Sequence, residues 1–159
     1  MNISRAKQIG RKKALISITL GLIISYLIIA LLWTTEGFVK SLLWISEFGY
    51  TLNILSGIAF LYTLGFFFGQ MSGVEILIRK RNPFFTGIKY AFLTLIISAT
   101  LASSIGFFQE GIHHFSEHET PIVDYIIKPL FWIGIFGFIP VILTGVFFGY
   151  SIKKRRLIL

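Results

Sequence analysis

Residues 14–33 read ALISITLGLIISYLIIALLW, a stretch that contains no charged side chain. A helix needs about 20 mainly apolar residues to cross the ~30 Å hydrocarbon layer of a bilayer, so this stretch is long enough to span a membrane. Its apolar run is longer than the core of a typical signal peptide, and no small-x-small cleavage site precedes Trp33. We therefore expect a transmembrane helix that remains in the mature protein.

Three further stretches have the same character and length, at about residues 51–69, 90–108 and 130–150. The four stretches and their connections occupy the chain, so we expect a single transmembrane domain over residues 1–159. The composition agrees, because 55% of the residues are hydrophobic and 14% are charged, whereas soluble domains are about 25% charged. The sequence predicts an all-α integral membrane protein with four transmembrane helices.

The charged residues are distributed unevenly between the connections. Thirteen of the 15 basic residues and one acid lie in the N-terminal tail, the connection after the second span and the C-terminal tail, which gives these segments a charge of +12. The other two connections hold two basic residues and six acids, a charge of −4. Because positive segments resist translocation, both termini are predicted to lie in the cytoplasm of a bacterium, with the chain in its inner (plasma) membrane.

A formal net charge of +8 could also indicate a protein that binds nucleic acid. The basic residues flank the apolar stretches, however, where they set topology and attract anionic lipid headgroups. We therefore expect the lipid bilayer and anionic lipids at the cytoplasmic face as partners, and no nucleic acid.

The second and fourth spans share a pattern of glycines at an offset of 80 residues. The matched positions are Gly57, Gly65 and Gly69 in one span, and Gly137, Gly145 and Gly149 in the other. The dipeptide Glu36-Gly37 after the first span recurs as Glu110-Gly111 after the third. This pattern predicts two parallel-repeat helical hairpins, from duplicated halves at about residues 10–82 and 88–156, related by an axis along the membrane normal.

These six glycines are also the predicted helix-packing residues, because small side chains let helix backbones approach closely in a bilayer. Two uses remain open: packing within one four-helix bundle, or a homo-oligomer, especially through Gly65, Gly69 and Gly73. In the fourth span, Pro140 is expected to kink the helix, and Thr144 to help satisfy the backbone groups that the kink frees.

Several kinds of chemistry have no support in the sequence. No Asp, Glu, Lys, Arg or His falls within a proposed span, which argues against ion-coupled transport by a single chain and against haem bound by histidines. The absence of cysteine excludes disulfides, thiolate metal sites and cysteine nucleophiles. No phosphate-binding loop is present. We expect no cofactor and favour a protein that is not an enzyme.

One cluster of potential metal ligands lies after the third span. If that helix continues, Glu110, His114 and His118 share a face at a spacing of four residues, which suits zinc or another divalent metal. Two alternatives are a solvated polar loop and a switch that responds to histidine protonation.

The sequence thus favours an accessory, sensor or scaffold subunit that acts within a membrane assembly, as a homo-oligomer or with other membrane or cytoplasmic subunits. A first alternative is an oligomeric pore or small-solute transport subunit, with a path lined by Ser98, Thr100, Ser103 and Ser104. A second is a metal-dependent membrane protein that uses the histidine and glutamate cluster.

Overall fold

The computed structural model describes residues 2–32, 51–108 and 120–156. Four long α-helices make up most of this part of the chain, and a short π-helix, η3, leads into the last of them. Their bounds are α1 (Ile3–Leu32), α4 (Thr51–Leu77), α5 (Pro83–Gly106), η3 (Val123–Ile127) and α6 (Lys128–Arg156). The described residues contain no strand, so the predicted all-helical class is confirmed for them.

Three of these helices are long and apolar enough to cross a membrane. The segments are Leu52–Leu77 in α4, Pro83–Gly106 in α5, and Val123–Lys154 across η3 and α6. The first helix, α1, is not among the three, and its first eleven residues include five of the basic residues of the N-terminal tail. Three helices with the length and composition needed to cross a membrane are therefore confirmed, and four membrane crossings stay a prediction.

The helices run past the predicted spans at the end where the basic residues lie. Helix α4 continues to Leu77, well beyond the predicted boundary at residue 69, and α5 begins at Pro83 rather than at residue 90. The start of α5 has a local cause. The Asn82 side chain accepts a hydrogen bond from the Phe84 backbone N–H (2.9 Å), and the fixed φ of Pro83 suits the first turn of a helix.

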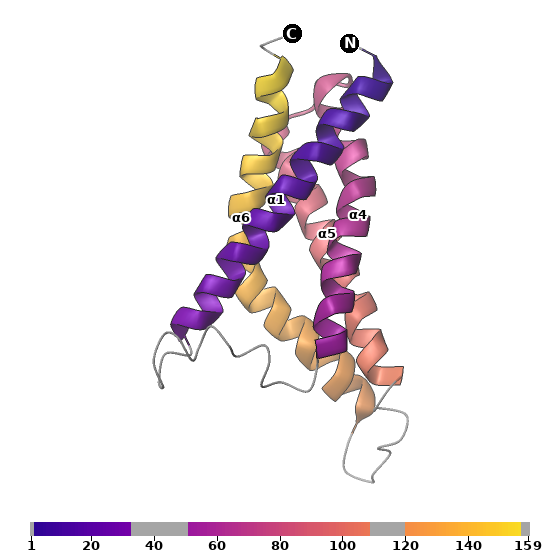
Figure 1. Ribbon diagram of the computed structural model, residues 1–159, viewed down its shortest axis with the longest axis vertical. Coiled ribbons are helices and arrows are strands. Elements are labelled where there is room, and N and C mark those ends of the chain that lie inside the picture. The colour runs from indigo at the N-terminus through magenta and orange to yellow at the C-terminus, as the bar shows by residue number, and fades with distance from the viewer. Residues whose placement is uncertain (1, 33–50, 109–119, 157–159) are drawn as a thin grey trace.

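Figure 1 shows that the two termini and the turn between α4 and α5 lie at the same end of the bundle. Helix α1 contacts α4 and α6, and α5 contacts α4 and α6, so the four helices close into a ring. Helices α1 and α4 separate towards the opposite end (Figure 1). The three basic segments that the charge pattern assigned to one side are thus together.

Helices α1 and α4 meet backbone to backbone near the termini. A Cβ atom added at Gly10 would collide with the Gly69 carbonyl oxygen and would lie 2.8 Å from the Cα of Gly73. A Cβ at Gly69 would lie 2.6 Å from the Ala14 Cβ. Close backbone approach of this kind is how helices associate in lipid, where burial of large apolar side chains gains little. A side-chain contact follows further along, between the hydroxyls of Thr19 and Tyr62 (2.8 Å).

Helices α5 and α6 repeat this contact. A Cβ at Gly87 would collide with the Gly145 carbonyl oxygen and lie 2.9 Å from the Cα of Gly149, while a Cβ at Gly145 would lie 3.1 Å from the Ala91 Cβ. In this geometry Gly145 corresponds to Gly69, an offset of 76 residues. The predicted offset of 80 is one helical turn longer. Glycines four residues apart still match after a shift of one turn, so the pattern could not fix this register.

Helix α6 changes direction near its middle (Figure 1), where Pro140 is fully buried. Proline has no N–H, so the Phe136 carbonyl loses its helical donor and the helix bends. The Thr144 hydroxyl donates to the carbonyl oxygen of Pro140 (2.7 Å). The expected kink is present. The Thr144 hydroxyl bonds the carbonyl of Pro140 itself, however, and not the Phe136 carbonyl that the kink frees.

The glycine contacts predict opposite effects for two Gly→Ala changes in α6. Gly149→Ala should lower the free energy of unfolding by about 1–3 kcal/mol, because its Cβ would collide with the Pro83 carbonyl oxygen. Gly134→Ala should leave stability equal or slightly higher, because a Cβ there meets no atom within 4 Å and alanine favours a helix. Thermal unfolding followed by circular dichroism in detergent compares the two. Equal stability of the variants would contradict a backbone contact between α5 and α6.

Candidate functional site

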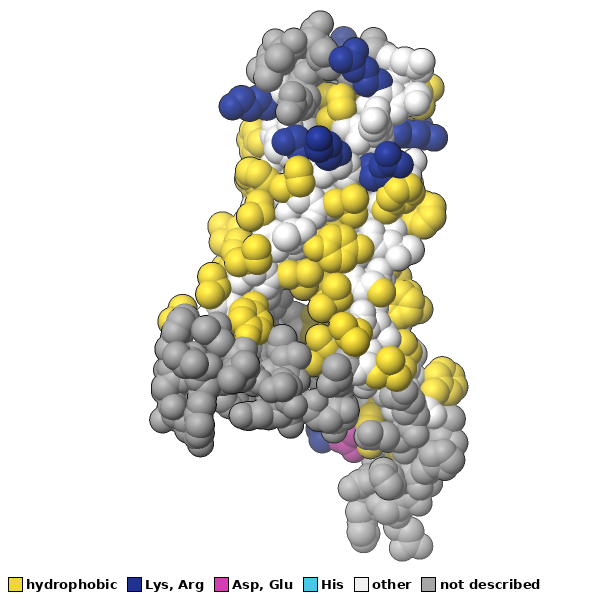
Figure 2. All heavy atoms as spheres, in the orientation of Figure 1, with side chains coloured by type: hydrophobic (Ala, Val, Ile, Leu, Met, Phe, Trp, Pro, Cys, Tyr) yellow, Lys and Arg dark blue, Asp and Glu magenta, His cyan; other side chains and the backbone are white. Residues whose placement is uncertain are grey.

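The most distinctive polar surface of the described chain is its cationic end, which we define as the basic residues that gather near the two termini. Figure 2 shows, on one face, Lys and Arg side chains gathered above the apolar body of the bundle. The members are Arg5, Lys7, Arg11, Lys12 and Lys13 of α1, Arg79, Lys80 and Arg81 of the α4–α5 turn, Lys89 of α5, and Lys153 and Lys154 of α6. Segments far apart in the sequence thus form one positively charged surface.

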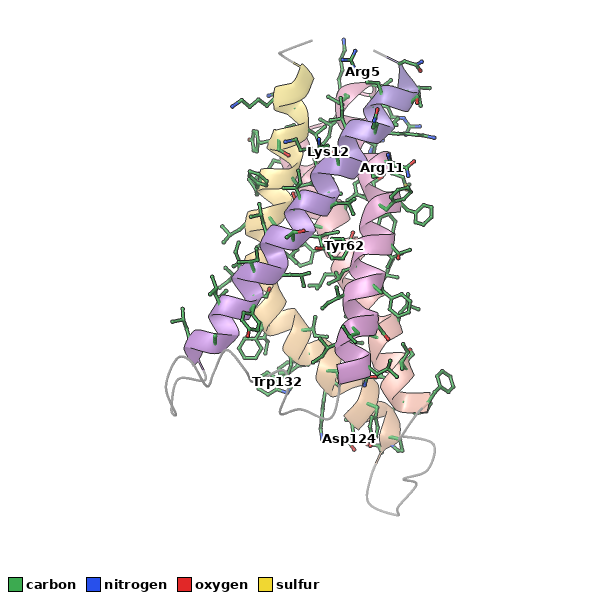
Figure 3. The ribbon with its side chains drawn as sticks, viewed as in Figure 1. Arg5, Arg11, Lys12, Tyr62, Asp124 and Trp132 are labelled. Atoms are coloured by element: carbon green, nitrogen blue, oxygen red, sulfur yellow. The ribbon has the colours of Figure 1, made fainter. Side chains whose placement is uncertain are left out.

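The basic residues of α1 project from the side of the helix, as Figure 3 shows for Arg5, Arg11 and Lys12. The guanidinium of Arg11 lies over the ring of Phe66 in α4, 4.9 Å from its centroid. This cation–π contact places a charge at the border between the apolar helix surface and the polar end. Long basic side chains commonly do this at a membrane surface, with their apolar stems against the protein and their charged ends in the headgroup layer.

A single carboxylate, Glu75, faces these cations in the described chain. The Tyr90 hydroxyl donates a hydrogen bond to the Glu75 Oε1 atom (3.0 Å), and the Lys89 Nζ lies 4.0 Å from the same oxygen. The Glu75 side chain is only 12% exposed, and the Tyr90 ring packs beside the ring of Phe68. The cluster therefore joins α4 to α5, and it leaves the other cations at this end available to anionic groups.

The opposite end of the bundle has a different charge pattern. Asp124 and Lys128 form an ion pair one helical turn apart, at the junction of η3 and α6. Figure 3 places Asp124 and Trp132 at this end, away from Arg5 and Lys12. Its charges largely balance within the described residues, whereas those of the cationic end do not.

The predicted metal ligands Glu110, His114 and His118 lie outside the described residues. The described ranges 2–32, 51–108 and 120–156 contain no cluster of potential metal ligands. A divalent metal at the histidine cluster stays a prediction.

All six predicted packing glycines face a neighbouring helix of the same chain. Besides the contacts above, a Cβ at Gly57 would lie 3.4 Å from Ala102, one at Gly65 would collide with Ile18, and one at Gly137 would lie 2.9 Å from Leu95. The Gly65, Gly69 and Gly73 face packs against α1. Within one chain, α1 occupies this face, and a homo-oligomer stays a prediction.

The hydroxyls suggested to line a pore do not share one surface. Ser98 and Ser103 are buried within the bundle, and Thr100 is exposed on the outside of α5. Thr100 and Ser104 donate to the carbonyl oxygens of Ile96 and Thr100, which satisfies them within the helix.

Two glycine contacts that join helices at the cationic end were not predicted from the sequence. Gly10 and Gly87 lie outside the predicted spans, beside basic residues, and were not among the predicted packing positions. A shared pattern could have found them: residues 10–14 and 87–91 both read Gly-x-Lys-x-Ala. The link between Glu75 and Tyr90 has no comparable pattern.

Comparisons with protein-family models, curated proteins and solved structures find no match to this chain.

The cluster at Glu75 predicts a measurable coupling between two substitutions. Tyr90→Phe and Glu75→Gln should each lower stability by about 1–2 kcal/mol, because a hydrogen bond to a partly buried carboxylate is lost or weakened. The double variant should lose less than the sum of the two single losses. Unfolding in detergent measures all three, and Tyr150→Phe, at an exposed tyrosine of α6, is the control. Strictly additive losses would show that the two side chains do not interact.

Proposed function

We propose that this chain is a four-span protein of a bacterial inner membrane with both termini in the cytoplasm. We further propose that it acts without catalysis, as an accessory, sensor or scaffold subunit of a membrane assembly. The observation that carries the proposal is the gathering of three separate basic segments at one end of a helical bundle. Such segments are retained on the cytoplasmic side during insertion, so one cationic end favours an even number of crossings.

The surroundings of α1 support its role as the fourth span. It packs along α4 and α6, both of which are long and apolar enough to cross a membrane. Its outer face exposes large apolar side chains at helical spacing: Ile16, Leu20, Ile23, Leu27 and Leu31. In a bilayer this face would contact lipid, whereas in water it would be an extended apolar patch. The matching contacts of Gly10 and Gly87 also favour two duplicated hairpins.

A role without catalysis is supported by the chemistry of the helix interiors. The described stretches 14–32, 51–74, 91–108 and 129–152 contain no Asp, Glu, Lys, Arg or His. Charged groups at membrane depth usually mark proton or ion pathways. The cationic end is left as the surface through which the protein would contact anionic headgroups or an acidic region of a partner subunit, at about 1 kcal/mol per basic residue near an anionic membrane.

Single cysteines test the topology, because the natural chain has none. An impermeant maleimide added to intact cells, or to spheroplasts if an outer membrane intervenes, should label Thr120→Cys, which lies at the end of the bundle opposite the cationic end. It should label Ser4→Cys, near the N-terminus, only after the membrane is opened. Both residues are exposed. Labelling of Ser4→Cys in intact cells together with protection of Thr120→Cys would reverse the orientation and overturn the proposal.

Native mass spectrometry of the protein from its own membranes tests the accessory role. We expect the 18.1 kDa chain to appear with a second subunit at fixed stoichiometry. A triple change of Arg79, Lys80 and Arg81 to Gln should reduce that association at least about tenfold, because the cationic end, the proposed contact surface, loses three positive charges. Lys128→Gln, at the opposite end, is the control, and the cysteine assay confirms unchanged topology. A strictly monomeric protein with no partner in mild detergent and in nanodiscs would contradict the role.

A further inference from the structure

A cavity of about 770 Å³, partly open to the outside, lies between the helices on the side away from the cationic end. All four long helices and η3 contribute to its wall. It exists because α1 and α4 separate in this half, α6 bends at Pro140, and small residues such as Gly57, Ala102 and Gly106 face inwards. Its volume falls within the ~300–1,000 Å³ typical of sites for small organic ligands.

The cavity narrows towards the cationic end into a smaller space of about 100 Å³. Leu22, Leu61, Leu95 and Gly137 line both spaces, so the two are adjacent. The glycine contacts between the paired helices limit the room beyond this point. The combined space is therefore wide near the far end of the bundle and narrow towards the cationic end.

Most of the wall consists of aliphatic and aromatic side chains, but two polar atoms stand out. The Oδ1 atom of Asn53 and the hydroxyl of Ser98 are buried and have no hydrogen-bond partner among the described residues. The Ser98 residue is 1% exposed, and its hydroxyl does not bond its own helix as the hydroxyls of Thr94 and Thr100 do. Buried polar atoms without partners are costly, and a ligand that bonds them would remove that cost.

The charges at the wall restrict the kind of ligand. Asp124 is the one ionisable carboxylate among the described lining residues, and it is paired with Lys128. The described lining residues include no cation that could balance an anionic headgroup. A buried charge without a partner is strongly disfavoured, so the pocket suits a neutral molecule.

We propose that this cavity binds a neutral lipid with a hydroxylated head and a long apolar chain. The head donates a hydrogen bond to Asn53 at the wide end, and the chain extends along Leu61, Leu95 and Ile133 towards the narrow end. Asn53 belongs to the first turn of α4, and its side chain lies against Gly106 at the end of α5, so the head would lie near the membrane surface. The proposal depends on the bundle and not on the accessory role.

Photolabelling of the full chain in nanodiscs tests the proposal. The probe is a monoacylglycerol with a diazirine in its chain, and the comparison probe has the same chain with a phosphocholine head. We expect the monoacylglycerol probe to label residues of the cavity wall at least about tenfold more than the phosphocholine probe, since both charges of the zwitterionic phosphocholine head would lack a partner among the described lining residues. Competition with diacylglycerol and with a long-chain isoprenoid alcohol then distinguishes the two natural sources of such a lipid.

Two variants and a matched control localise the binding. Ala102→Phe fills the cavity and should reduce labelling by about tenfold or more, while Ala59→Phe, at an exposed position of α4, should not. Asn53→Leu removes the acceptor and should abolish the preference for the hydroxylated head, even if Ala102→Phe fails to fold. Equal labelling by both probes, or labelling confined to outer faces, would overturn the proposal. Either outcome would leave the proposed accessory role intact, because cysteine labelling and native mass spectrometry test that role without involving the cavity.

Discussion

The structure depends on direct contact between helix backbones at a few glycines near the cationic end. Gly10 meets Gly69 and Gly73 across α1 and α4, and Gly87 meets Gly145 and Gly149 across α5 and α6. In a membrane, leucine against leucine is little better than leucine against lipid, so the distance between backbones largely decides how tightly helices associate. A methyl group at most of these positions would force the helices apart. Both hairpins are therefore joined at the same end.

This constraint accounts for the polarity of the bundle. Tight pairing near the termini brings basic segments from the start, middle and end of the chain onto one surface, where they repel one another. Glu75 lies between α4 and α5 at this end and offsets part of the repulsion through Lys89, while its bond to Tyr90 joins the two hairpins. Among the described residues, no glycine contact of this kind joins α1 to α4 near the far end. Helices α1 and α4 separate there, and the large cavity lies in this half of the bundle.

The sequence was sufficient to predict the features that depend on composition. Charge distribution alone placed both termini and the middle connection together, and the structure brings these segments to one end. Apolar length predicted helices but not their bounds, because a helix ends where its capping groups are, as at Asn82, and not where the hydrocarbon ends. Because helices were expected to end with the apolar stretches, Gly10 and Gly87 were not predicted as packing positions: both lie in helices but outside those stretches. The cavity was not predictable, since it depends on the relative directions of α1 and α6.

The α1–α4 and α5–α6 pairs share the glycine contact, and two of the sequence differences between them bear on the polar and apolar features of the bundle. At the contact register of 76 residues, Pro140 of α6 corresponds to Leu64 of α4, so only one hairpin carries the bend. At the same register, Glu75 corresponds to Ser151, whose hydroxyl donates to the Phe148 carbonyl oxygen within its own helix. Of these two positions, only Glu75 links its helix to a neighbouring helix through a carboxylate. The bend at Pro140 therefore shapes the cavity from one side alone, and the Glu75 link is the one described place at the cationic end where a carboxylate faces the basic residues.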